Sequence, residues 1–132
     1  MGGLRIGIAG LGVVGAEVAK LLLNRADGLA AQAGTEMKLT AVSARSRTKN
    51  RGFSMDGIDF VDNPVDLAAR DDVDIIVELM GGADGPALAL TEAALKAGKH
   101  VVTANKAMIA HHGQKLAEAA EGTGRALMFE AA

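Results

Sequence analysis

A lysine stands where an apolar run turns into a helical pattern, in the stretch "HVVTANKAMIAHHG" at residues 100–113. Val101 to Thr103 complete a predicted strand, Asn105 is a suitable N-cap, and Lys106 falls in the first helical turn. An ammonium group at this position opposes the helix macrodipole, which suits a lysine that acts as general acid or proton relay. Position alone supports equally the alternative that Lys106 extends into solvent.

Three glycines form a G-x-G-x-x-G motif in the segment "GIAGLGVVGAEV" at residues 7–18. The motif follows an apolar run and opens an amphipathic helix, which is the context in which it binds a dinucleotide. Gly10 permits the tight turn, Gly12 the approach of backbone N–H groups to a pyrophosphate, and Gly15 close packing of the helix. A merely structural glycine-rich turn is the alternative. The predicted cofactor contacts in this turn are Gly10, Leu11, Gly12, Val13, Val14 and Gly15.

The end of the second predicted strand indicates which dinucleotide binds. NAD-binding proteins usually place Asp or Glu there to accept from the ribose 2′-hydroxyl. This sequence has "VSARSRTKNRG" at residues 42–52 instead, without a carboxylate. Its arginines suit a 2′-phosphate, so we expect NADP to be preferred over NAD. Arg45 is the main predicted contact, with Ser46 and Arg47 beside it, and a solvated basic loop is the alternative.

A second glycine turn ends a later strand in "IIVELMGGADGP" at residues 75–86. Gly81 and Gly82 would let the backbone approach the nicotinamide half of a cofactor. For Glu78 two interpretations carry equal weight, contact with a ribose hydroxyl or a strand-end acid that faces water. His111 and His112 point about 100° apart on a helix, so they do not form one metal-binding face. We expect one packed and one exposed histidine, and no metal site.

Alternating strands and helices must bring these turns together. The predicted strands cover residues 4–9, 37–44, 73–80, 99–104 and 125–132, and the predicted helices cover residues 13–28, 63–73, 86–98 and 105–124. This alternation is typical of an α/β fold, a doubly wound parallel sheet of the Rossmann type with helices on both faces. In the first helix we expect a buried stripe of Val14, Val18, Leu21 and Leu22. Ligands of such folds bind at the carboxyl ends of the strands.

Length and composition narrow the class of protein. The 132 residues fit one domain, residues 1–132. A net charge of −2 and the absence of Trp and Tyr argue against a nucleic-acid partner. No segment approaches the roughly 18 apolar residues of a membrane span. The chain has no cysteine, which is compatible with a reducing compartment. We therefore expect a cytoplasmic protein without a membrane partner.

Four segments together resemble the homoserine dehydrogenase family: "GIAGLGVVG", "VELMGG", "GKHVVTANKAMIAHHG" and "LMFEAA". The resemblance covers essentially the whole chain and is to the family's N-terminal nucleotide-binding domain. It implies an NAD(P)-dependent oxidoreductase that interconverts aspartate semialdehyde and homoserine in threonine, methionine and isoleucine biosynthesis. It also implies that Thr103, Asn105 and Lys106 line the place where nicotinamide meets substrate, with Lys106 as the catalytic residue for proton transfer.

The family continues beyond the closing "FEAA" into a substrate-binding and dimerisation region, whereas this sequence ends at Ala132. We therefore expect an isolated cofactor domain with little or no turnover, whose full-length enzyme takes a small-molecule substrate and forms a homo-oligomer. In the family the glutamate matching Glu130 lies beside a monovalent cation, a site that Glu130 alone does not build. The alternative hypotheses for the function are an NAD(P)-dependent dehydrogenase of another amino acid and a non-catalytic dinucleotide-sensing module.

Overall fold

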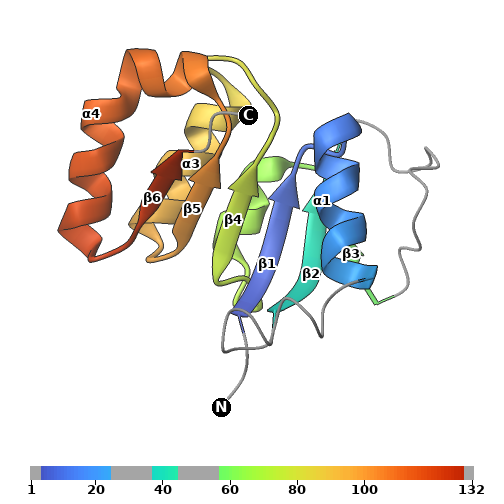
Figure 1. The fold of residues 1–132 in the computed structure, drawn as a ribbon. Coiled ribbons are helices and arrows are strands. Elements are labelled where there is room, and N and C mark those ends of the chain that lie inside the picture. Colours follow the sequence, from blue (N-terminus) through green and yellow to red (C-terminus); the bar gives the residue numbers. More distant parts are fainter. Residues whose placement is uncertain (1–3, 25–36, 45–56, 130–132) are drawn as a thin grey trace.

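The chain folds into a six-stranded parallel sheet with helices on both faces, as a computed structural model shows (Figure 1). The structure describes residues 4–24, 37–44 and 57–129. The strand order is β3-β2-β1-β4-β5-β6, so the chain builds outward from β1 first to one edge and then to the other. This topology confirms the predicted doubly wound α/β fold.

The elements follow the predicted order. The strands are β1 Leu4–Ala9, β2 Met37–Ser43, β3 Asp59–Phe60, β4 Ile75–Glu78, β5 His100–Thr103 and β6 Leu127–Phe129, and the helices are α1 Val13–Asn24, the 3-10 helix η1 Pro64–Ala69, α3 Pro86–Lys96 and α4 Lys106–Thr123. The predicted helix at 63–73 is thus a shorter 3-10 helix, capped as expected by the Asn63 side chain. Strand β3 was not predicted, because two residues carry no periodic pattern.

Two apolar clusters hold the helices against the sheet. On one face, Ile8 and Val42 pack with Ala19 of α1. On the other face, Ile76 and Val101 pack in the cluster that includes residues of η1, α3 and α4. Figure 1 shows α1 in front of the sheet and α3 behind it. The four central strands β1, β2, β4 and β5 are therefore largely buried on both faces, which explains why their sequences read as nearly continuous apolar runs.

The buried stripe of α1 differs from the prediction. Val14 was expected in the stripe, but 57% of its surface is exposed. Gly15 and Ala19 are buried instead, and Val18 packs partly against the core. The stripe is shifted because Gly15, which has no side chain, makes the closest contact with the turn after β1. The side chains of Leu21 and Leu22 lie outside the described part of the structure.

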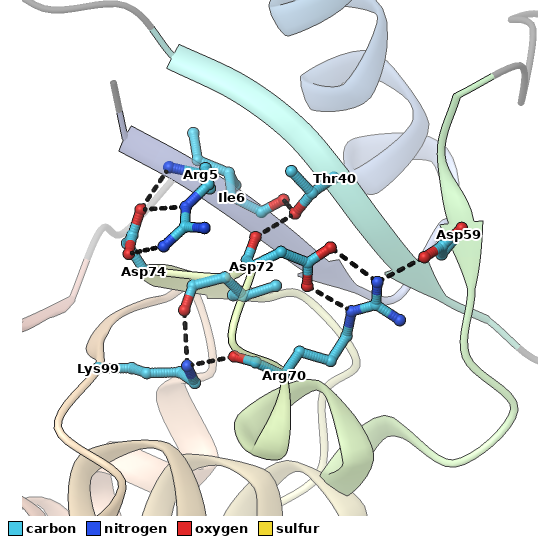
Figure 2. Close-up of polar contacts among 9 residues, drawn as sticks. Arg5, Ile6, Thr40, Asp59, Arg70, Asp72, Asp74 and Lys99 are labelled. Atoms are coloured by element: carbon cyan, nitrogen blue, oxygen red, sulfur yellow. Dashed lines mark hydrogen bonds and ion pairs between the residues drawn. The ribbon is translucent and has the colours of Figure 1, made fainter. Parts of the chain in front are cut away.

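A polar network ties the amino ends of the strands together (Figure 2). The Arg5 guanidinium donates to both carboxylate oxygens of Asp74, at 3.1 and 3.0 Å, and Arg70 pairs in the same way with Asp72. The hydrogen bond from Arg5 holds the pKa of the Asp74 carboxyl below its ordinary value of 3.8. The buried Lys99 ammonium donates to the Arg70 and Val73 carbonyls at 2.7 and 2.6 Å. This network lies at the sheet edge opposite the predicted site.

Candidate functional site

The glycine turns and the start of α4 meet at the carboxyl edge of the sheet, where the strand arrowheads of Figure 1 end. Backbone hydrogen bonds join the strand ends there. The Gly10 N–H donates to the Ser43 carbonyl at 2.8 Å, and the Leu79 N–H donates to the Ala9 carbonyl at 2.8 Å. The ends of β2, β1 and β4 are therefore held side by side, and the turns that follow them form one surface.

The turn after β1 leaves no room for side chains at two of its glycines. Gly10 has a φ of 101°, and a Cβ atom there would lie 2.8 Å from the Leu79 carbonyl carbon and oxygen. A Cβ atom on Gly15 would lie 1.8 Å from the Gly10 oxygen, so only glycine lets α1 begin this close to β1. Around Gly12, by contrast, a Cβ atom would meet nothing within 4 Å. The turn is thus tightly packed at Gly10 and Gly15 and open around Gly12, and the open space fits a diphosphate at the start of α1.

The other predicted contacts in this turn differ in exposure. Leu11 is 5% exposed and packs in the core on the α1 face, so its side chain is not available to a ligand. Val14 projects from the first turn of α1 and is one of the large apolar side chains that solvent reaches. The side chain of Val13 lies outside the described part of the structure. The turn therefore offers mainly backbone groups to a ligand.

At the end of β2 the described chain stops at Ala44, and the predicted contacts Arg45, Ser46 and Arg47 lie outside the described residues. Ser43, the last residue of the strand, is 1% exposed. In the described ranges its hydroxyl is the one buried side-chain polar atom without a hydrogen-bond partner. An unpartnered buried hydroxyl costs free energy, and Ser43 ends β2 at the carboxyl edge, where folds of this type bind dinucleotides.

The helix after β5 begins as the sequence predicts. Asn105 caps α4, its Oδ1 accepting from the Met108 N–H at 3.0 Å. Its Nδ2 donates to the Gly82 carbonyl at 2.6 Å, which joins the start of α4 to the glycine turn after β4. Lys106, the first residue of α4, is exposed. Within the described part of the chain, no hydrogen bond or ion pair engages its ammonium group, so its side chain can extend over this edge.

The second glycine turn has the backbone that its residues predict. Gly81 and Gly82 have φ values of 83° and 86°, which favour glycine. Both residues are exposed. Their backbone is therefore accessible at the carboxyl edge, next to Asn105.

Glu78 and Thr103 are more buried than the sequence indicated. Glu78 is 0% exposed, so the interpretation of a strand-end acid facing water was wrong. Both of its carboxylate oxygens already accept hydrogen bonds from the protein, which leaves no exposed atom for a ribose hydroxyl. Thr103 is 1% exposed, and its hydroxyl donates to Glu78. The two residues pair in register on β4 and β5, and sequence spacing does not reveal such a register.

The histidines on α4 divide as expected. His111 is exposed, whereas His112 is half-buried and its Nε2 lies 2.7 Å from the Asp84 carboxylate. Among residues 4–24, 37–44 and 57–129, no three His, Cys, Asp or Glu side chains gather as metal ligands. In the same ranges, no helix combines the length and apolar character needed to cross a membrane.

The fold and the glycine turns define a dinucleotide-binding domain of the Rossmann type, and comparison with known proteins gives its family. Residues 10–130 match the family model described as "Homoserine dehydrogenase, NAD binding domain". The chain belongs to this family, as the sequence resemblance predicted, and its cofactor is a nicotinamide dinucleotide.

Individual relatives agree with this assignment. A homoserine dehydrogenase of Mycobacterium tuberculosis is 42% identical over 127 residues, which are 96% of this chain and 28% of the relative. A crystal structure of homoserine dehydrogenase from S. aureus superimposes with a TM-score of 0.87 at 34% identity, covering 99% of this chain and 33% of that one. A biliverdin reductase from Synechocystis, in complex with biliverdin and NADP+, superimposes with a TM-score of 0.73 at 25% identity, covering 96% of this chain and 37% of that one. The chain therefore spans less than a third of the curated relative's length.

Proposed function

We propose that this chain is the cofactor domain of a homoserine dehydrogenase that reduces L-aspartate 4-semialdehyde to L-homoserine with NAD(P)H. The observation that carries the proposal is the position of the "TANKA" segment. Asn105 bonds to Gly82, which sets the exposed Lys106 beside the glycine turn at the edge where Rossmann domains bind cofactors. When bound, the reduced nicotinamide supplies the hydride.

The residues of the chain have separate tasks in this proposal. The backbone of Gly10 to Gly15 holds the diphosphate, and Gly81 and Gly82 let the backbone approach the nicotinamide half. Lys106 is the catalytic residue, which donates a proton to the alkoxide oxygen that develops on the substrate. Its ammonium group is exposed and unpaired within the described ranges, so it is available for this transfer. Lys106 therefore affects the rate more than cofactor affinity.

NADP is the proposed preferred cofactor, and NAD the alternative. The support is the lack of an acid after β2 and the basic residues Arg45 and Arg47 with Ser46 between them. Arg45→Ala should weaken NADPH binding by about tenfold and leave NADH binding unchanged, because NADH carries no 2′-phosphate. Equal loss for both cofactors in a calorimetric titration would refute this role of Arg45.

The proposed whole enzyme acts in the cytoplasm as a homo-oligomer on a small-molecule substrate, without a nucleic-acid or membrane partner. A chimera tests the activity: this chain is fused to the remaining part of the M. tuberculosis relative, and NADPH oxidation by aspartate semialdehyde is followed. We expect activity in the chimera and a loss of kcat of about 100-fold or more in Lys106→Ala, with little change in cofactor affinity.

Lys115→Ala is the matched control, because Lys115 lies on the same helix and is also exposed, paired with Glu92. It should leave kcat unchanged. A chimera that folds and binds NADPH but shows no turnover, with Lys106 or with alanine in its place, would instead support the non-catalytic dinucleotide-sensing module.

A further inference from the structure

Glu78 is a fully buried carboxylate at the carboxyl end of β4, directly beneath the second glycine turn. Its Oε2 accepts from the Met80 N–H at 2.7 Å and from the Gly81 N–H at 3.3 Å. Its Oε1 accepts from the Thr103 hydroxyl at 2.7 Å. Three donors thus converge on one side chain, two from the turn after β4 and one from the last residue of β5. Burying a carboxylate costs free energy, which such donors offset.

These contacts continue into a closed ring of hydrogen bonds. The Thr103 oxygen accepts from the Asn105 N–H at 3.0 Å, and the Asn105 side chain donates to the Gly82 carbonyl. Gly82 follows Gly81 in the chain, so the path returns to Glu78. The ring consists of Glu78, Gly81, Gly82, Asn105 and Thr103. It fixes the glycine turn after β4 relative to the first turn of α4.

We propose that Glu78 is a positioning residue that holds together the two segments that face the nicotinamide half of the cofactor. This inference rests on the proposed function, since it assigns the glycine turn and Lys106 to that half. Glu78 itself touches no ligand, because its side chain is 0% exposed and both oxygens are engaged. It acts through the backbone at Gly81 and through Thr103 and Asn105. The adenosine half, held at the turn after β1, lies outside this ring.

Glu78→Gln tests the role with little change of shape. If the glutamine oxygen faces the Met80 and Gly81 N–H groups, its NH2 group donates to the second lone pair of the Thr103 oxygen, and the Thr103 O–H loses the acceptor that Glu78 provides. If the amide is flipped, the NH2 group faces two N–H donors. Either orientation leaves at least one buried donor of the ring without an acceptor, because an amide has one acceptor atom where the carboxylate has two.

The assay is calorimetric titration with a whole cofactor and with its nicotinamide-free fragment. NADPH is paired with 2′-phospho-ADP-ribose, and NADH with ADP-ribose. Glu78→Gln should weaken binding of the whole cofactor by on the order of tenfold, as expected for one lost charge-assisted contact. It should change the affinity for the fragment by less than about twofold. A merely structural defect would weaken the binding of the cofactor and of the fragment equally.

Two further variants complete the test. Thr103→Val breaks the ring at another point, and valine has nearly the same shape as threonine. The loss of affinity for the whole cofactor should therefore resemble that in Glu78→Gln, and the two losses should not add in the double variant. Thr103→Val also serves if Glu78→Gln fails to fold. Asp74→Asn removes a carboxylate contact at the opposite edge and should change neither affinity.

The outcomes separate the two proposals. Equal weakening of cofactor and fragment in both ring variants, or no weakening in either, would overturn the positioning role and leave the cofactor site in place. If wild-type protein binds neither ligand, the proposed cofactor site itself fails, and the positioning role fails with it.

Discussion

Substituting alanine for two glycines of the turn after β1 should separate the fold from ligand binding. In Gly15→Ala the new methyl carbon would start 1.8 Å from the Gly10 oxygen, whereas real Cβ contacts essentially never fall under 3.0 Å. Helix α1 must therefore move by more than about 1 Å, and overpacking of this kind costs about 1–3 kcal/mol or more. In Gly12→Ala the methyl group meets nothing within 4 Å, so the free energy of unfolding should change by less than about 0.5 kcal/mol.

Cofactor affinity should follow a different pattern. The methyl group at Gly12 occupies the open side of the turn and displaces the diphosphate from backbone N–H groups. A hydrogen bond to a charged group contributes about 1.5–3 kcal/mol, so Gly12→Ala should weaken NADPH binding by about 10- to 100-fold without destabilising the protein.

Two assays measure these effects independently. Urea unfolding is followed by far-ultraviolet circular dichroism, because the chain has no Trp or Tyr to report on unfolding. Binding is followed by NADPH fluorescence, which the protein does not obscure for the same reason. Wild-type affinity in Gly12→Ala would refute the placement of the diphosphate, and wild-type stability in Gly15→Ala would refute the packing argument.

Three further predictions concern stability. Asp74→Asn should make the free energy of unfolding depend less on pH in acid. Arg5 holds the Asp74 pKa below 3.8, so the stabilisation from the ionised Asp74 carboxylate is present above that value and is lost as pH falls below it. Unfolding at pH 7 and pH 3 measures the difference, and an unchanged pH dependence would contradict it. Asn105→Ala should cost about 1 kcal/mol through the lost cap, and an unchanged urea midpoint would argue against that cap. Lys99→Met should cost about 1–3 kcal/mol, because its buried ammonium donates to two carbonyls, whereas exposed Lys96→Met should not.

Sequence patterns within single segments were sufficient to predict most of the fold and the two glycine turns. The apolar runs and glycine punctuation predicted five of the six strands in order, and the Asn63 and Asn105 caps were predicted because capping depends on a few adjacent residues. Only the two-residue β3 was absent from that prediction. The G-x-G-x-x-G spacing indicated the packing of Gly15, since that contact lies within the motif.

Features that depend on contacts between segments were not predictable. The sequence shows an acid at Glu78 and a threonine at Thr103, but only the register of β4 against β5 places them 2.7 Å apart. Val14 illustrates the same limit, because its exposure follows from the contact of Gly15 with the turn after β1 rather than from helical periodicity. The residue types suggested a role for each position, and the tertiary arrangement determined which atoms were available for it.

The most direct test of the central claim is calorimetric titration of the wild-type chain with NADPH and, separately, with NADH. We expect saturable binding at one site per chain, tighter for NADPH, with the nicotinamide-free fragment competing for the same site. Absence of binding by both cofactors, in protein shown by circular dichroism to be folded, would contradict the assignment of the carboxyl edge as a working dinucleotide site.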